Sequence, residues 1–276
     1  MRFGFVVPNN FGVDDPHAVV RLGVLAEELG FASVWVNHHV LNVGYVRDRL
    51  GDQPYQDALV MLTWLAAQTS RVQLGTSVLV MPYLHPMVLA KQLATLDQLC
   101  GGRLVIGLGA GSLPEENAAL GAPYTDRGAY CNEFIQVLRL MWTGQPVSFA
   151  GQFFNFDSVV SSPRPLQQPN PPLVIGGNRP PALRRVAQLG DGWHPLNCSA
   201  DGVRRRLEVI ADEAAAVPDG RVPELVQVRL DMARVDEAAV AEYAAAGVTD
   251  LVMSLNTGDT AEIERSLERF AATIFA

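Results

Sequence analysis

The stretch VQLGTSVLVMPYLHPMVLAKQLATLDQLCGGRLVIGLGAGS, residues 72–112, decides the fold. It opens with a β-branched run over residues 72–78, which predicts a strand. Pro86 then begins a helical pattern with leucines at three- and four-residue spacing: Leu89, Leu93, Leu96 and Leu99. The glycine pair at residues 101–102 ends the helix, and residues 103–109 form a second apolar strand. A strand–helix–strand unit of this length predicts a right-handed parallel crossover.

Both strands of this unit end in unusual sequence. Thr76-Ser77-Val78 follows the first strand, and Gly109-Ala110-Gly111 follows the second. In a parallel crossover both segments leave the sheet at the same edge, and that edge is where parallel α/β proteins place their chemistry.

The rest of the chain repeats the alternation of strand and helix. Strands are predicted at residues 2–7, 33–36, 72–78, 103–109, 173–175, 191–195, 225–235 and 251–254. Eight strands alternating with helices predict an α/β fold of the (β/α)8 TIM-barrel type, forming a single domain over residues 1–276. The competing architecture, a doubly wound sheet, would place its glycine-rich turn after the first strand, with an acidic residue roughly 20 positions later. Here the glycines follow the fourth strand, which favours the barrel.

Two segments depart from this alternation. Residues 147–156 read as a small β-hairpin turning at Gly151-Gln152, an excursion outside the barrel after the fourth strand unit. Residues 42–55 lack periodicity and carry mixed charge, so we expect an irregular, mobile lid.

Composition limits the class of function. The 276-residue chain is 49% hydrophobic and carries a net charge of −8, which argues against a nucleic-acid partner. No apolar run approaches the roughly 18 residues of a membrane span, and the chain starts directly with a strand. We therefore expect a cytoplasmic protein with a small-molecule substrate, and a homodimer is left open. Three cysteines without a CxxC motif argue against disulfides and a cysteine zinc site.

The basic residues indicate a source. Lys91 is the single lysine and the other basic residues are arginines, in a chain rich in alanine. This usage suggests a GC-rich genome and suits an actinobacterial protein.

Two glycine turns are candidate ligand sites. The run GLGAGS, residues 107–112, is either a tight barrel turn or a backbone that lets a flat ring approach closely. Gly176-Gly177-Asn178 precedes a helix opened by Pro180, so its amides could bind phosphate, with Arg179, Arg184 and Arg185 adding positive charge. A plain turn is the alternative there.

The histidines offer the other candidate chemistry. His38 and His39 follow the second strand on the same rim, beside Asn37. Adjacent residues on an extended segment point to opposite faces, so a metal site is not expected. His194 could face either the pocket or the barrel wall, and His85, at a helix start, is expected to be structural. The Arg204-Arg205-Arg206 run is expected to be a solvated helix face. No GxSxG or P-loop motif is present, so nucleophilic hydrolysis and phosphoryl transfer lack support.

Several segments together resemble the luciferase-like monooxygenase family, specifically its F420-dependent oxidoreductase branch. The matching segments are AEELGFASVWVNHHV (residues 26–40), LGTSVLVMPYLHPMVLAKQLATLDQLCGGRLVIGLGAG (74–111), the loop from Glu115-Glu116 to Arg127-Gly128, PPLVIGGN (171–178) and ALRRVAQLGDGWHP (182–195). The resemblance covers residues 2–195 well and the last third loosely, and it implies a (β/α)8 barrel.

The resemblance also implies site residues. Family members bind a flavin or deazaflavin at the barrel rim, beside a non-proline cis peptide that corresponds to Ser77-Val78. The family's acidic residue–histidine pair corresponds to His38-His39, so His39 is the candidate catalytic residue and His38 stands where the acid would be. Ala110 and Gly111 would border the ring, and Gly176, Gly177, Asn178 and Arg179 match a phosphate turn. Some F420-using dehydrogenases carry a glutamate where this chain has Ser112, so the general acid falls to His39 or to the substrate.

The reading that follows is an oxidoreductase that moves a hydride between coenzyme F420 and a small organic substrate. His39 would deliver a proton or hydrogen-bond to the ring, since an imidazole with a pKa near 6.5 can do either at neutral pH. The alternatives are an FMN-dependent luciferase-like monooxygenase and a catalytically silent flavin-binding barrel. The second is suggested by the loss of acids at His38 and Ser112.

Overall fold

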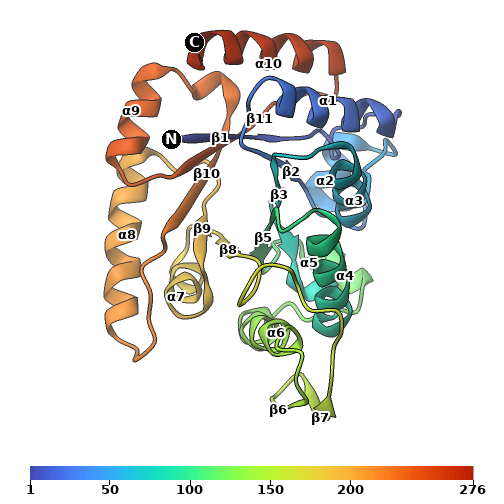
Figure 1. Ribbon diagram of the computed structural model, residues 1–276, viewed down its shortest axis with the longest axis vertical. Helices are drawn as coiled ribbons and strands as arrows, with labels where there is room; N and C mark the ends of the chain where they lie inside the picture. Colours follow the sequence, from blue (N-terminus) through green and yellow to red (C-terminus); the bar gives the residue numbers. More distant parts are fainter. Residues whose placement is uncertain (276) are drawn as a thin grey trace.

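The computed structural model describes residues 1–275 as a closed ring of eight parallel strands. The ring strands are β1 (Arg2–Val6), β2 (Ser33–Val36), β3 (Gln73–Thr76), β5 (Leu104–Gly109), β8 (Leu173–Gly176), β9 (Gly192–His194), β10 (Leu225–Asp231) and β11 (Asp250–Ser254). Each pairs in parallel with its neighbours in chain order, and β11 pairs with β1 to close the ring (Figure 1). The expected (β/α)8 barrel is confirmed.

One long helix follows each ring strand and lies on the outside of the barrel (Figure 1). These helices are α1 (Pro16–Glu28), α3 (Ala58–Gln68), α4 (Pro86–Leu99), α6 (Arg127–Met141), α7 (Pro180–Leu189), α8 (Ala200–Ala215), α9 (Glu237–Ala245) and α10 (Thr260–Ile274). Several begin where a short polar side chain accepts a hydrogen bond from the first turn, which is the sequence signal that positions them. The capping residues are Asp15, Asp57, Ser199, Asp236 and Asp259.

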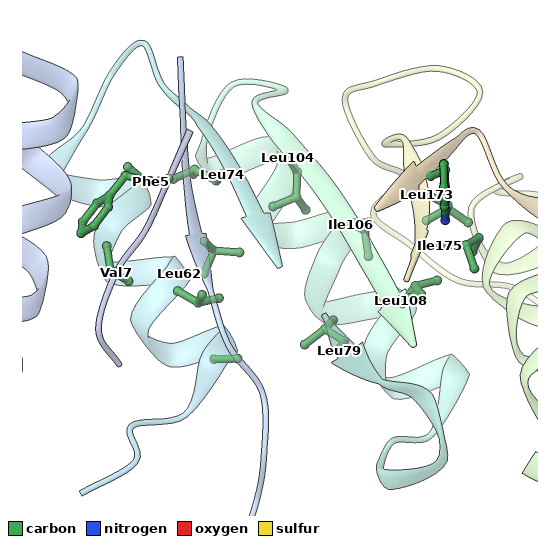
Figure 2. Packing of buried hydrophobic residues seen from close by; sticks show 14 of the residues in the cluster. Phe5, Val7, Leu62, Leu74, Leu79, Leu104, Ile106, Leu108, Leu173 and Ile175 are labelled. Atoms are coloured by element: carbon green, nitrogen blue, oxygen red, sulfur yellow. The ribbon is translucent and has the colours of Figure 1, made fainter. Parts of the chain in front are cut away.

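The strands bury both faces, and alternation decides which side chain faces which core. Leu104, Ile106 and Leu108 of β5 join the large core between strands and helices, part of which Figure 2 shows. Val105 instead points into the barrel, where it packs with Val6, Trp35, Val174 and Val252. The wide indole of Trp35 fits there because β3 carries Gly75, whose Cβ, if present, would lie 2.2 Å from the ring.

The hairpin lies outside the ring, as expected. It consists of β6 (Val147–Ala150) and β7 (Asn155–Val159), so its second strand ends three residues later than predicted. The carboxylate of Glu133 on α6 holds its turn by accepting hydrogen bonds from the amides of Gln152, Phe153 and Phe154.

The expected irregular lid at residues 42–55 is wrong in part, because it contains the helix α2 (Gly44–Leu50). Two turns are too short to show a helical period, but Val46 and Leu50 lie four residues apart and so share a face. That face packs on Leu113 and Tyr55, which stabilises the helix from outside its own sequence.

Two predicted strands are also interrupted. The third strand divides into β3 and the short β4 (Leu79–Val80), with Ser77-Val78 between them, and the 3-10 helix η1 (Met81–Tyr83) follows. The predicted strand at 225–235 ends at Asp231, whose side chain caps the 3-10 helix η2 (Met232–Arg234).

Candidate active site

The predicted site residues all lie at the carboxyl ends of the strands, on one rim of the barrel. His38 and His39 follow β2, Ser77 and Val78 follow β3, Ala110 and Gly111 follow β5, and Gly176 to Arg179 lie at the end of β8. Because β5 pairs with both β4 and β8, the two glycine turns and the Ser77-Val78 peptide are neighbours. The parallel ring therefore brings together residues up to about half the chain apart.

His39 is paired with a buried carboxylate. Its Nδ1 atom lies 2.6 Å from Oε2 of Glu116, a residue on the short helix α5 (Pro114–Ala119). Oε1 of Glu116 accepts hydrogen bonds from the amides of Val40 (2.7 Å) and Leu41 (3.1 Å). Burial alone would raise the pKa of Glu116, but the hydrogen bonds from His39 and these amides outweigh it and lower that pKa. Glu116 is thus an anion that fixes the imidazole's orientation.

The other nitrogen of His39 faces the helix α2. The Tyr45 hydroxyl lies 2.9 Å from His39 Nε2, so the two ring nitrogens are held by Glu116 on one side and Tyr45 on the other. Tyr45 is half exposed, whereas the His39 side chain is 15% exposed and Glu116 is fully covered. The imidazole therefore lies at the boundary between the protein interior and the rim.

His38 has a different environment from His39. It is buried, and its Nδ1 accepts a hydrogen bond from the Val80 amide of β4 at 3.0 Å. Burial lowers its pKa to about 4, so the ring is neutral at pH 7. His38 therefore helps to hold β4, the short strand that follows Ser77-Val78, in place.

The Ser77-Val78 peptide is cis, as expected, and Ser77 is bonded on two sides. Its hydroxyl lies 2.8 Å from His194 Nε2, and both its hydroxyl and its carbonyl oxygen accept hydrogen bonds from Arg229 of β10. His194 is 3% exposed and stacks on Trp35 with ring centroids 4.8 Å apart. His194 therefore does not face an open pocket. Its ring is packed inside the barrel wall, below Ser77.

The glycines of the GLGAGS run make room for protein rather than for a ligand ring. A Cβ at Gly107 would lie 1.9 Å from the Thr76 carbonyl oxygen, and one at Gly109 would lie 2.6 Å from Cγ2 of Val78. Packing against Thr76 and Val78 therefore accounts for glycine at these two positions, as expected for a tight barrel turn. Beyond them, Ala110 and Gly111 are half-buried at the rim, and Gly111 has a φ of +74° that favours glycine.

The Gly176-Gly177-Asn178 turn presents free amides. The backbone N–H groups of Gly177, Asn178 and Arg179 donate to no acceptor within residues 1–275, and Gly177 has a φ of +115°. The start of α7 adds none, because Pro180 and Pro181 lack an N–H and Ala182 donates to the Arg179 carbonyl. The unbonded amides therefore lie in the turn itself and not at the helix terminus.

The arginines expected around this turn are arranged differently. Arg184 pairs with Glu213, and Arg185 is buried against α6, where it donates to Asn132 and to the Gly128 carbonyl. Both expectations of positive charge at the turn are wrong, because helical spacing directs these side chains to neighbouring helices. Arg206, expected to be solvated, instead donates from Nε to the Asn178 carbonyl at 3.0 Å. Arg179 remains exposed at the turn.

These features suit a phosphate-bearing flavin or deazaflavin. Three consecutive free amides line the turn, and Val78 and His39 lie along the same rim. Within residues 1–275, no cluster of three His, Cys, Asp or Glu side chains could hold a metal ion. Nor does any helix in that range have the length and apolar character needed to cross a membrane.

The family assignment follows from comparison with known proteins. The family model described as luciferase-like monooxygenase matches residues 1–272. The chain belongs to the luciferase-like monooxygenase family. The expected resemblance to this family is thereby confirmed.

Named relatives of this luciferase-like protein include F420 enzymes. An F420-dependent glucose-6-phosphate dehydrogenase of Kineococcus radiotolerans is 33% identical over 78% of this chain. That match covers 64% of the dehydrogenase, so less than two thirds of the relative's length is represented. Among solved structures, the monooxygenase RslO1 of Streptomyces bottropensis has a TM-score of 0.79 at 22% identity, covering 100% of this chain and 99% of its own. An F420-dependent secondary alcohol dehydrogenase in complex with an F420-acetone adduct also has a TM-score of 0.79, at 18% identity and with 99% and 98% covered.

Three site residues of this luciferase-like barrel were missed from the sequence: Glu116, Tyr45 and Arg229. Glu116 was part of a family-like segment, but the adjacent Glu115 left no local signal of which carboxylate turns inward. Tyr45 lay in the supposed lid. Arg229 lies in the strand predicted at residues 225–235, where its side chain was given no role, and it donates to Ser77 and Asn37 across the rim.

Proposed function

We propose that the protein is an F420-dependent oxidoreductase that transfers a hydride between the deazaflavin and a small organic substrate. The observation that carries this proposal is the His39–Glu116 pair on the rim, where His39 follows β2 and Glu116 lies on α5, after β5. It is supported by the family membership and by relatives named as F420-dependent dehydrogenases.

In this proposal the cofactor supplies the hydride and the chain supplies binding and a proton. Glu116 accepts from Nδ1 of His39 and so directs Nε2 toward the rim, where Tyr45 now holds it. His39 holds or donates the proton at Nε2 when the Tyr45 hydroxyl gives way to substrate. Glu116 does not contact the substrate, and its role is to orient the imidazole and to stabilise its charged form.

The free amides at Gly177, Asn178 and Arg179 would hold the cofactor phosphate. Arg206 fixes the turn through the Asn178 carbonyl and adds a positive charge close to it. Because the whole chain carries a charge of −8, such local cations matter for a cofactor that bears several negative charges.

A catalytically silent barrel is less well supported. It was suggested by the missing acids at His38 and Ser112, and Glu116 supplies a carboxylate to His39 from another element. FMN-dependent monooxygenation remains the alternative, since a phosphate turn accepts either cofactor.

Titration of the cofactor-free protein with F420 and with FMN, at low and high salt, tests the cofactor. We expect F420 to bind more tightly, with an affinity that weakens as salt screens the charges of its acidic tail. Turnover of bound F420 is then measured with a panel of alcohols, aldehydes and enones. Tight FMN binding with no detectable F420 binding would contradict the proposal, and F420 binding without turnover of any panel member would support a silent barrel.

A further inference from the structure

Arg229 is a cation on the rim, and a single nitrogen of its guanidinium, Nη1, makes all of its side-chain hydrogen bonds. Its Nη1 donates to the Asn37 side-chain oxygen and to the carbonyl (3.0 Å) and hydroxyl (3.1 Å) oxygens of Ser77. Nε and Nη2 donate to no acceptor within residues 1–275. One nitrogen thus anchors the guanidinium, whereas Nε is buried without a partner and Nη2 is left without an acceptor.

The surroundings of Arg229 are polar but contain no carboxylate bonded to it. Asn37 is held by the side chains of Asn9 and Asn10, all neutral amides. Arg229 forms no ion pair in the described part of the chain. The Glu116 carboxylate forms no hydrogen bond or ion pair with it and is bonded instead to His39 and two amides.

A second arginine, Arg49, lies near Arg229 on the same rim. Arg49 of α2 donates to the Asn10 carbonyl at 3.1 Å and stacks over Phe11. Arg49 and Arg229 are therefore joined through Asn10 and Asn37. Burial, and then the charge of Arg49, lower the pKa of Arg229 to about 10, while the hydroxyls of Tyr55 and Tyr45 act in the opposite direction.

A partly buried guanidinium without a counter-ion is costly, because it has lost part of its water and gained no opposite charge. An anion bound at Nη2 would offset that cost. We propose that Arg229 is the anion-binding residue of this site, and that the site takes a ligand with a planar, negatively charged group, such as a carboxylate, against Nη2 of its guanidinium.

Two sources could supply that chemistry. The group is the carboxylate or enolate oxygen of a substrate, or it is the deazaflavin ring, whose carbonyl oxygens accept hydrogen bonds without carrying a full negative charge. Anion binding by itself does not depend on the proposed cofactor, whereas assigning the anion to a substrate rests on the proposed function.

The test compares anions with neutral compounds of the same shape. Benzoate and benzamide, and acetate and acetamide, are titrated into the cofactor-free protein, with thermal unfolding and calorimetry as readouts. We expect wild type and Arg229→Lys to prefer each carboxylate over its amide, and Arg229→Gln to lose at least about tenfold in carboxylate affinity. Arg265→Gln, which removes one exposed arginine charge from the outer helix α10, is the matched control and should behave like wild type.

A second arm measures F420 binding without substrate. Loss of carboxylate binding in Arg229→Gln assigns the anion to a substrate, and a loss confined to F420 affinity assigns it to the cofactor ring. Equal affinity of Arg229→Gln and Arg265→Gln in both arms overturns the proposal. If Arg229→Gln does not fold, the carboxylate preference of the wild-type protein decides, and absence of that preference together with unchanged F420 affinity in Arg229→Lys overturns it. Failure of F420 to bind wild type would count against the proposed function alone.

Discussion

Nδ1 of His39 lies 2.6 Å from Oε2 of Glu116, although 77 residues separate the two in the chain. One follows β2 and the other lies on α5, after β5, and the closed ring brings those loops together. The carboxylate also accepts the amides of Val40 and Leu41, so it fixes the loop after β2 as well as the imidazole.

Replacing Glu116 with glutamine should lower turnover by about 10- to 100-fold, because the neutral amide no longer stabilises a charged His39. KM should change much less than kcat, and the pH profile should shift. Glu115→Gln, a change of the exposed neighbouring glutamate, is the control and should leave turnover unchanged. Equal rates for Glu116→Gln and Glu115→Gln would remove His39 orientation from the mechanism.

Gly177→Val should weaken binding of the phosphate-bearing cofactor by at least about tenfold, since hydrogen bonds to a charged group contribute about 1.5–3 kcal/mol each. The φ of +115° is unfavourable for valine, and its Cβ would lie 2.9 Å from the Ala182 Cβ, so the turn must move. Gly101→Val, at another positive-φ turn with open space around it, carries similar backbone strain at the opposite end of the barrel. Unchanged cofactor affinity in a folded Gly177→Val protein would disprove the phosphate turn.

Gly109→Ala should destabilise the fold by about 1–3 kcal/mol, because the new Cβ would overlap Cγ2 of Val78. Val78→Ala removes that methyl group, so the double variant should recover part of the loss. Urea unfolding of the two single variants and the double variant measures the coupling. Strictly additive losses would mean that Gly109 is needed for a reason other than the space it leaves for Val78.

Stability should fall as the solution is acidified below about pH 6.5. Burial lowers the pKa of His38 from 6.5 to about 4 and that of His194 from 6.5 to about 3, so between these values the unfolded chain binds more protons than the folded one. The free energy of unfolding then decreases with falling pH, by about 2 kcal/mol for each histidine at pH 5. The lowered pKa of Glu116 acts in the same direction, but mainly below its ordinary value of 4.5 and so below pH 5.

Urea unfolding at pH 7 and pH 5 tests this dependence. His38→Gln, which retains an acceptor for the Val80 amide, should show about half of the wild-type loss between the two pH values. A free energy of unfolding that is constant or rises on acidification would show that the two rings are already charged in the folded protein.

The fold was largely predictable because its signals are local. Apolar periodicity marked all eight ring strands and their helices, and Asp15 or Pro86 marked helix starts within one turn. Strand ends at interruptions were less predictable: nothing local in residues 225–235 shows that Asp231 turns its side chain to cap a 3-10 helix. The helix α2 was missed because its stability comes from packing on Leu113, more than 60 positions away.

The site was predictable only as a set of strand ends. His39 and the 176–178 turn could be placed on the rim from the alternation alone. Their partners could not, since Glu116, Arg206 and Arg229 reach them through ring closure and through neighbouring helices. Arg185 shows the opposite error, because a side chain that looked free to meet a phosphate is used between α6 and α7.

Trp35 and His194 lie stacked across the barrel directly below Ser77, with Val6, Val105, Val174 and Val252 packed around the indole. Packed side chains therefore close the barrel below the site, so a ligand can enter and leave only from the rim. In the proposed function, a reactant lying beneath another would have to arrive first and depart last. The aromatic stack thus leaves the proposed reaction a single side from which both reactants must come.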